Sequence, residues 1–368
     1  MADPGSTVVL LVDRVAGPER ATAIRALVGA LGARGRPARV LCSSWGDADR
    51  RGLAVEESPG LGDRWRRPWA LRSFRAGAFA DRPLLIHVLE ARMAGAGLEI
   101  AEKWEIPYIQ GVEEFLAPGA RLRLSRRWCR GLLTTSRAVA DDLTREFGVP
   151  RGWVRVVPSG ISAPEPAPER RLGADSRVSV VGAAGPLTAG SGFSTFLNAA
   201  RRVLDAGVDA EFVIVGQGEE EGDLRRRAER LRIADRLTFA ADSAVGLSYW
   251  DVLDVYCQPS TVPTVGGDLA RAMAHGLPSV ASDVEGLRAL VDNQVTGLRV
   301  PPGDTIALAR AILELLGDPR RARRLGQEGR DAVLRDHDPA READALVELY
   351  DETALREPVA VAGSIRPA

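Results

Sequence analysis

Short β-branched runs alternate with amphipathic helical stretches twice along this chain of 368 residues. The alternation predicts parallel sheets covered by helices, so the expected fold class is α/β. The first series of runs starts at Val8 and the second at Val178. Between them, residues 163–171 carry three prolines and no core pattern, as expected of a linker. Each series is therefore predicted to form an α/β domain of its own.

The individual elements follow from the same periodicity. The expected strands are Val8–Asp13, Ala38–Cys42, Leu84–Val88, Tyr108–Gly111, Leu132–Thr134 and Val154–Val157 in the first series, and Val178–Ala183, Glu211–Val215, Leu237–Phe239, Asp254–Gln258 and Gly297–Val300 in the second. The expected helices include Glu19–Arg34, Ala94–Trp104, Arg137–Phe147 and Gly192–Ala206, the last with Phe193, Phe196, Leu197, Ala200 and Leu204 on one face.

The expected domain boundaries cover the whole chain. The first domain takes residues 1–163, the linker 164–171 and the second domain 172–337. Residues 338–356 predict a C-terminal helix that crosses back to the first domain. Residues 357–368 are small and apolar without periodicity, which is typical of a flexible tail.

Charge and rare residue types narrow the classes of function. A formal net charge of -1 gives no global attraction to nucleic acid, so no nucleic-acid partner is expected. Lys103 is the only lysine, which excludes a lysine-dependent step elsewhere. Cys42, Cys129 and Cys257 match neither a metal spacing nor a disulfide framework, and this favours a cytoplasmic location. The N-terminal apolar run does not read as a signal peptide, and no stretch approaches the roughly 20 residues of a membrane span.

Five segments follow one another in a characteristic order. They read VRVVPSGIS at 154–162, GPLTAGSGFSTFLNAA at 185–200, FVIVGQGEEEGDLRRRA at 212–228, QPSTVPTVGGDLARAMAHGLPSVASDVEGLRALV at 258–291 and VTGLRVPPGDTIALARAILELL at 295–316. Together they resemble the hinge and donor-site segments of family-4 (group 1) glycosyltransferases over nearly the whole chain. The resemblance implies the GT-B fold, in which two Rossmann-like domains face a central cleft, and a nucleotide sugar as donor without a metal or other cofactor.

The resemblance also implies a set of donor-binding positions, and several of them depart from the family pattern. The positions are Gly185, Pro186, Ser191, Gly192, Gly216, Gly218, Pro263, Gly266, Gly267 and Arg271. The family neutralises the donor diphosphate with an arginine and a lysine, where this chain has Pro186 and Ser191. Hydrogen bonds to charged groups contribute roughly 1.5 to 3 kcal/mol each, so losing both could cost about two to four decades in affinity or rate.

The family's two donor-site glutamates are also replaced. Pro263 stands where the family contacts sugar hydroxyls, and Arg271 where it grips the ribose. A guanidinium cannot accept a hydrogen bond, so Arg271 excludes the usual ribose contact, although it could serve as a substitute cation. A further family glutamate is Ala289 here. Gly266 and Gly267 could still offer backbone N–H groups to an anion at a helix N-terminus, whereas Asp268 disfavours one.

The first domain offers one candidate catalytic residue. Glu113 stands where the family places a histidine and is a candidate base; the alternative is that Glu113 and Glu114 form a solvated loop pair. His87 ends an expected strand and is expected to be a packed or capping residue rather than a catalyst. The histidines are too scattered to form a metal set, so no metal is expected.

The segment 63–82 interleaves aromatic and basic residues. Its core, the residues Trp65, Arg66, Arg67, Trp69 and Arg72, is a candidate patch for an anionic membrane surface or an acceptor. The alternative is a loop and helix whose aromatic rings complete the core. A membrane patch would place the protein peripherally at the inner face of the membrane.

Three functions stay open. The first is a family-4-like protein of polysaccharide or glycoconjugate biosynthesis whose catalysis is lost or depends on a partner, for which a catalytic paralogue is a candidate. The second is an active retaining transferase that binds its nucleotide sugar in a divergent way and uses a lipid-linked or glycan acceptor. The third is a glycan- or protein-binding module on the same fold.

Overall fold

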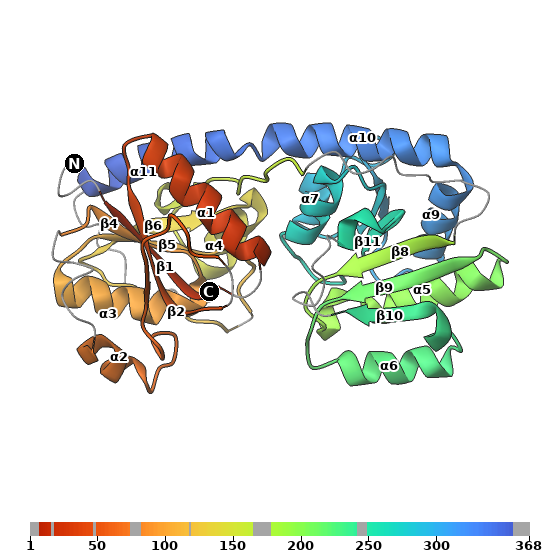
Figure 1. Cartoon of the computed structure of the whole chain (residues 1–368), viewed down its shortest axis with the longest axis horizontal. Coiled ribbons are helices and arrows are strands. Elements are labelled where there is room, and N and C mark those ends of the chain that lie inside the picture. Colours follow the sequence, from red (N-terminus) through yellow and green to blue (C-terminus); the bar gives the residue numbers. More distant parts are fainter. Residues whose placement is uncertain are drawn as a thin grey trace. The chain divides into compact units, whose positions relative to one another are not determined.

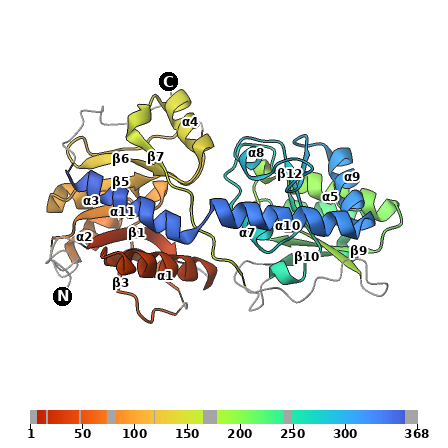
Figure 2. The ribbon, with the colours of Figure 1, turned by 90° about the horizontal axis from the view of Figure 1, so that it is seen from above.

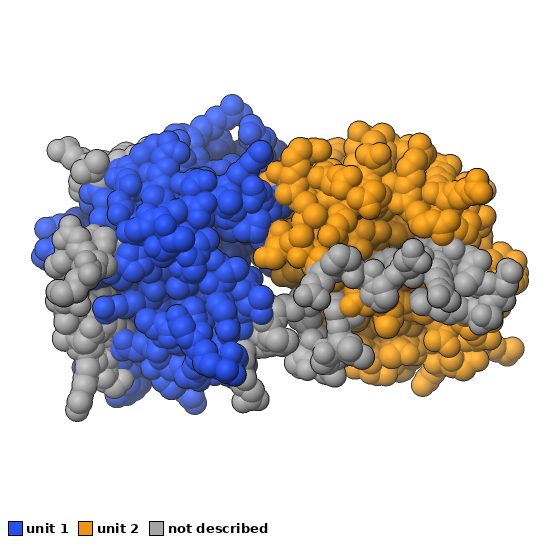
Figure 3. All heavy atoms as spheres, turned by 45° about the horizontal axis from the view of Figure 1, so that its top comes forward, with its two compact units in different colours: residues 1–160, 337–368 blue, residues 161–336 orange. Residues whose placement is uncertain are grey.

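The chain forms two compact units (Figure 3), Met1–Gly160 with His337–Ala368 and Ile161–Asp336. The computed structural model describes residues 7–15, 18–46, 49–73, 82–117, 119–164, 178–240 and 249–355. The expected linker beyond Pro164 and the expected tail at 357–368 lie outside these ranges. None of the helices in the described ranges combines the length and the apolar composition needed to cross a membrane.

The first unit is built on one sheet of parallel strands. Its strands are β1 (Val8–Val15), β2 (Ala38–Trp45), β3 (Val55–Glu57), β4 (Leu85–Val88), β5 (Tyr108–Gly111), β6 (Cys129–Thr134) and β7 (Val154–Val156). Its helices are α1 (Pro18–Ala33), α2 (Arg67–Ser73), α3 (Ala94–Trp104), α4 (Arg137–Phe147) and α11 (Pro339–Leu355). The strand order β3-β2-β1-β4-β5-β6-β7 reverses between β1 and β4, the point where such sheets open a crevice.

The C-terminal helix α11 belongs to the first unit and packs beside α1 (Figures 1 and 2). Its buried Leu346, Leu349 and Tyr350 share one apolar cluster with Val8 and Leu10 of the sheet. Tyr350 also reaches a polar partner, because its hydroxyl lies 2.8 Å from Nδ1 of His87 in β4. His87 is buried there, so the expectation that it is packed is confirmed.

The second unit repeats the architecture with a six-stranded parallel sheet. Its strands are β8 (Ser179–Ala184), β9 (Ala210–Val215), β10 (Leu237–Ala240), β11 (Val255–Gln258), β12 (Ser279–Ser282) and β13 (Leu298–Val300). Its helices are α5 (Phe193–Asp205), α6 (Glu221–Arg230), α7 (Gly267–Ala274), α8 (Leu287–Leu290), α9 (Thr305–Gly317) and α10 (Pro319–Asp336). The order β10-β9-β8-β11-β12-β13 reverses between β8 and β11.

Helix α5 shows how periodicity becomes packing. Phe196 and Leu197 are fully buried, and the Phe196 ring meets Phe212 of β9 edge-on with centroids 5.9 Å apart. Val203 occupies the end of the buried face that the sequence assigned to Leu204, which is half-buried. The buried face of α5 therefore begins at the expected residues, but in the last turn it includes Val203 instead of Leu204.

Candidate functional site

Three loops of the second unit lock together beyond the carboxyl ends of β8, β9 and β11. The backbone N–H of Leu187, after β8, donates to the carbonyl of Gln217, after β9, at 2.9 Å. The N–H of Thr261, after β11, donates to the carbonyl of Gly190 at 2.9 Å. In a sheet of this order, the ligand site lies outside these strand ends. We call these three loops, at residues 185–192, 216–220 and 259–265, the loop group. The loop group is therefore the candidate donor site.

Close packing explains three glycines of the loop group. A Cβ at Gly192, whose φ is 75°, would collide with the carbonyl oxygen of Pro259. A Cβ at Gly216 would collide with the carbonyl oxygen of Gly185, and one at Gly218 with that of Leu187. Backbone of one loop thus presses on backbone of the next at each position. These contacts alone require glycine, whether or not a ligand binds.

Pro186 and Ser191 face each other within the loop after β8. The Ser191 hydroxyl donates to the carbonyl of Pro186 at 2.5 Å, and its Oγ lies 3.1 Å from Thr188 Oγ1. Pro186 is exposed and lacks a backbone N–H. The loop is thus closed by its own neutral hydrogen bonds, and residues 185–192 contain no cationic side chain.

Helix α7 brings the remaining glycines beside the loop group. Gly266 caps the helix with φ 78°, and a Cβ there would stand 2.5 Å from Cδ2 of Leu287. Nothing lies within 4 Å of a Cβ on Gly267. Packing therefore accounts for the glycine at 266, whereas the backbone at 267 faces open space and is accessible to a ligand.

The charged residues of α7 form an ion pair with each other. Arg271 Nη1 lies 3.0 Å from Asp268 Oδ1, one helical turn away. The other carboxylate oxygen, Oδ2, lies 3.7 Å from the position of a Cβ on Gly185. The pair thus sits against the start of the loop after β8. Pro263 and Ala289 are exposed.

A buried polar chain lies at the same strand ends, and sequence reasoning missed it. The Tyr256 hydroxyl donates to Oε1 of Gln258 at 2.6 Å, and Nε2 of Gln258 donates to Oγ of Ser260 at 3.2 Å. All three side chains are buried. The signal available was a glutamine at the end of an otherwise apolar strand.

In the first unit, Glu113 follows β5 and is half-buried. Burial raises the pKa of its carboxyl to about 7; Arg20 opposes this shift, while the carboxylates of Glu90 and Glu342 reinforce it. A carboxyl with a pKa near 7 can accept or donate a proton at neutral pH, as a general base or acid must. Glu114 is exposed, so only this member of the expected loop pair is well solvated.

Buried polar groups around Glu113 were not found from the sequence. Glu90, after β4, pairs with Arg20 and with Nε of Arg92 at 2.5 Å. Gln110 Nε2 donates to the carbonyl of Glu90 at 3.1 Å. The ends of β4 and β5 are thereby tied together. A glutamine inside the apolar strand YIQG was the available signal.

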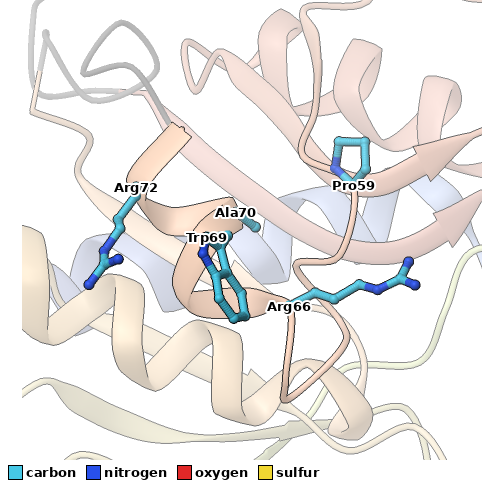
Figure 4. Close-up of a pocket in the computed structure, with 5 residues that line it drawn as sticks. All are labelled: Pro59, Arg66, Trp69, Ala70 and Arg72. Carbon is cyan, nitrogen blue, oxygen red and sulfur yellow. The ribbon is translucent and has the colours of Figure 1, made fainter.

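The aromatic and basic patch of the first unit is exposed. Trp65 and Trp69 are 76% and 67% exposed, so the alternative that these rings complete the core is wrong. Trp69, Arg66 and Arg72 border an open hollow of about 620 Å³, with the indole between the two arginines (Figure 4). Residues 74–81 of the segment lie outside the described ranges.

Arg67 does not belong to this exposed patch, contrary to the sequence prediction. It is buried, and its Nε donates to the carbonyl of Leu61 at 2.9 Å while Nη1 contacts Glu99 of α3 at 3.1 Å. Lys103, also of α3, donates to the carbonyl of Leu71 at 2.7 Å. Both ends of α2 are thus fixed to α3, because Arg67 and Lys103 bond across the interface.

Within the described part of the chain, no three histidine, cysteine, aspartate or glutamate side chains gather closely enough to hold a metal ion. The three cysteines are buried and unpaired.

Comparison with known sequences decides the family. Residues 178–318 match the family described as "Glycosyl transferases group 1", and residues 21–163 match "Glycosyltransferase Family 4". The chain belongs to the family-4 (group 1) glycosyltransferases. The first match contains the loop group and the second contains Glu113 and α2, so both candidate regions lie inside the family's own domains.

Relatives within this family carry several transferase names. The 2-deoxystreptamine N-acetyl-D-glucosaminyltransferase of Streptomyces fradiae is 32% identical over 58% of this chain and 55% of its own length. The phosphatidyl-myo-inositol mannosyltransferase of Mycobacterium leprae is 34% identical over 44% of this chain and 43% of its own. The glycogen synthase of Mycobacterium tuberculosis is 26% identical over 73% and 69%. The chain thus spans about half the length of the first two relatives.

Solved glycosyltransferase structures share the fold along nearly the whole chain. A glycosyltransferase from Rickettsia africae superposes with a TM-score of 0.75 at 14% identity, covering 96% of this chain and 100% of that one. HepE from Anabaena, solved with UDP-glucose, gives 0.74 at 17% identity over 94% and 99%. The GT-B fold expected from the sequence is confirmed.

Proposed function

We propose that this family-4 glycosyltransferase acts in the synthesis of a polysaccharide or glycoconjugate, and that its catalysis is lost or depends on a partner enzyme. One observation carries the proposal: the loop after β8 offers a diphosphate Pro186 and Ser191, whose hydroxyl is engaged by the Pro186 carbonyl. A leaving diphosphate needs positive charge or strong hydrogen-bond donors where its own charge develops. This loop supplies neither from its side chains.

The neighbouring charges strengthen the proposal. Arg271 is the cation of α7 beside the loop, and its charge is balanced by Asp268 at 3.0 Å. The alternative, an active retaining transferase with Arg271 as phosphate clamp, requires this ion pair to open. A catalytic paralogue that supplies the missing charge is the partner we favour.

A ligand panel tests the proposal on the purified full chain. A ligand at one hundred times its Kd stabilises the folded state by about 2.7 kcal/mol, which shifts the Tm of a unit of this size by roughly 5 to 10 °C. We expect shifts below about 1 °C, within the error of such measurements, from UDP, GDP and ADP sugars. A shift of the larger size, or sugar transfer at ordinary enzymatic rates, would overturn the proposal.

We also propose that α2 and the turn before it hold the first unit against an anionic membrane, where a lipid-linked acceptor would be reached. Indole rings favour the membrane interface, and arginines favour anionic lipid headgroups. Arg64, Arg66 and Arg72 flank the two exposed tryptophans, and Asp63 Oδ1 accepts the Trp65 N–H at 2.7 Å, which fixes the turn. The patch is thus aromatic and basic, and a hydrogen bond holds the turn that carries Trp65.

Vesicle sedimentation checks this contact. Each basic residue near an anionic surface contributes about 1 kcal/mol, so three arginines should favour phosphatidylserine vesicles over phosphatidylcholine vesicles by about two decades. Trp65→Ser with Trp69→Ser should abolish sedimentation. The matched control, Val295→Ser with Ile306→Ser, removes apolar side chains that are 48% and 47% exposed in the other unit and should change nothing. Equal loss in both double variants would refute the contact.

A further inference from the structure

A second basic surface of the first unit lies before β6, at residues 121–128, which we call the arginine segment. Leu122 and Leu124 are 5% and 6% exposed, and they fix the segment to the unit. Arg121 and Arg123 alternate with these leucines and are exposed. The alternation of buried leucine and exposed arginine thus holds two cations on the outer side of the segment.

The arginine segment ends in a turn that carries two further exposed arginines, Arg126 and Arg127. Ser125, which is buried, holds this turn, because its backbone N–H donates to the hydroxyl of Tyr108 in β5 at 2.9 Å. Its carbonyl oxygen accepts the N–H of Cys129, the first residue of β6, at 3.1 Å. The turn is therefore bonded to two neighbouring strands of the sheet.

The positive charge of the arginine segment is only partly balanced. The sequence contains no aspartate or glutamate from Phe115 to Ala140. Arg127 Nη2 lies 4.0 Å from Oε1 of Glu105, and both side chains are more than half exposed, so solvent weakens this ion pair. No other carboxylate among the described residues pairs with an arginine of the segment. Four arginines and one carboxylate leave a formal charge of +3.

The end of α3 connects the arginine segment with the aromatic and basic patch on α2. Lys103, in the last turn of α3, donates to the carbonyl of Leu71 in α2 at 2.7 Å, and α2 lies beside α3 (Figure 1). Glu105, directly after α3, is the partner of Arg127. Arg82 donates to the Glu105 carbonyl at 2.9 Å and adds another exposed cation there. Cations therefore follow one another from α2, past the end of α3, to the arginine segment.

We propose that the arginine segment is a second contact of the first unit with an anionic membrane, made by Arg121, Arg123, Arg126 and Arg127 through attraction to lipid headgroups. The inference rests on the membrane contact of α2 proposed above and names a second part of the same surface. The two parts differ in chemistry, because exposed indole rings at α2 favour the membrane interface, whereas the arginine segment exposes guanidinium groups over buried leucines.

The charge of the arginine segment alone does not hold the protein on a membrane. Each basic residue near an anionic surface tightens binding about fivefold, so four contribute a factor of roughly 600. A single myristoyl chain, with an association constant of about 10⁴ per molar, gives only marginal binding. The arginine segment therefore strengthens a contact that still requires Trp65 and Trp69, in keeping with the loss of sedimentation expected when both are replaced.

Vesicle sedimentation of the full chain with two double variants tests the inference. Arg121→Gln with Arg123→Gln, and Arg126→Gln with Arg127→Gln, should each weaken binding to phosphatidylserine vesicles about 25-fold. Binding to phosphatidylcholine vesicles should not change. Arg126→Lys with Arg127→Lys keeps both charges and should bind phosphatidylserine vesicles as the wild type does.

The matched control, Arg320→Gln with Arg324→Gln, removes the same charge from exposed positions of α10 in the other unit and should bind as the wild type does. The inference is wrong if either glutamine variant of the segment binds phosphatidylserine vesicles as tightly as the wild type. It is also wrong if the control or the lysine variant loses as much affinity as the glutamine variants.

Two further outcomes are decisive. Loss of heparin binding in the glutamine variants without loss of vesicle binding would assign the arginine segment to anionic glycans and overturn the membrane contact proposed for it. If the wild type itself does not sediment with phosphatidylserine vesicles, the membrane contact of α2 is wrong, and this inference fails with it. A wild type that sediments, with glutamine variants that sediment equally, overturns this inference alone.

Discussion

Replacing Pro186 by arginine and Ser191 by lysine is expected to tighten the binding of UDP by about two to four decades. The estimate assumes two new charge-assisted hydrogen bonds of roughly 1.5 to 3 kcal/mol each. Pro186 is exposed, so an arginine there can extend into solvent without displacing core residues. Replacing the proline also restores one backbone N–H to the loop.

The substitution at 191 removes a contact as well as adding a charge. Ser191 now donates to the Pro186 carbonyl, and a lysine side chain would leave that carbonyl to solvent. Because the site is exposed, water can replace the lost hydrogen bond at little cost. Isothermal titration with UDP measures the affinity of the double variant.

The control for this experiment adds the same two charges elsewhere. Ala206→Arg with Gln327→Lys places them at exposed positions of the same unit, outside the loop group. General attraction of UDP to a more basic unit would appear equally in both double variants. If neither variant binds UDP, the missing positive charge at Pro186 and Ser191 does not explain why the loop group fails to bind a diphosphate.

Strong periodicity made most of the fold predictable from the sequence. Helices α3 and α4 have the predicted bounds because their apolar residues recur at helical spacing between clear breaks. Strand β12 was not predicted, since its sequence SVAS is small and half polar. Its serines are nevertheless buried, because helices α7, α8 and α9 pack against the strand.

The candidate site was only partly predictable, because charge is visible in a sequence and proximity is not. The missing cations at Pro186 and Ser191 could be counted from the motif alone. The burial of Arg67 could not, since it depends on Leu61 and Glu99 from separate segments. In the same way, only the folded loops show that Gly216 and Gly218 serve backbone packing.

Acid is expected to weaken the first unit through His87. Burial lowers the pKa of His87 from 6.5 to about 4, and its imidazole bonds to Tyr350 of α11. The unfolded chain therefore binds more protons than the folded unit between these values. The contribution of His87 to the free energy of unfolding is fully present above pH 6.5 and is lost as the pH falls toward 4. The loss reaches about 3 kcal/mol, at no more than roughly 1.4 kcal/mol per pH unit.

Glu113 opposes this effect in the same unit. Its pKa is raised from 4.5 to about 7, so the folded unit binds more protons than the unfolded chain in that window. The stability it contributes is present below pH 4.5 and is lost as the pH rises through 7. The pH ranges in which His87 and Glu113 change the stability overlap. A plot of the wild type's free energy of unfolding against pH would therefore conceal both contributions.

Two single variants separate the opposing slopes. His87→Gln keeps a hydrogen-bonding partner for Tyr350 but cannot titrate, so its stability relative to the wild type should rise as the pH falls from 6.5 to 4. Glu113→Gln should show the opposite trend between pH 7 and 4.5. Urea unfolding followed by pulse hydrogen exchange in peptides from β4 and α11 reports the first unit alone. If His87→Gln and the wild type keep a constant difference across this range, the imidazole is not held neutral by burial, and α11 docking is not acid-sensitive through this pair.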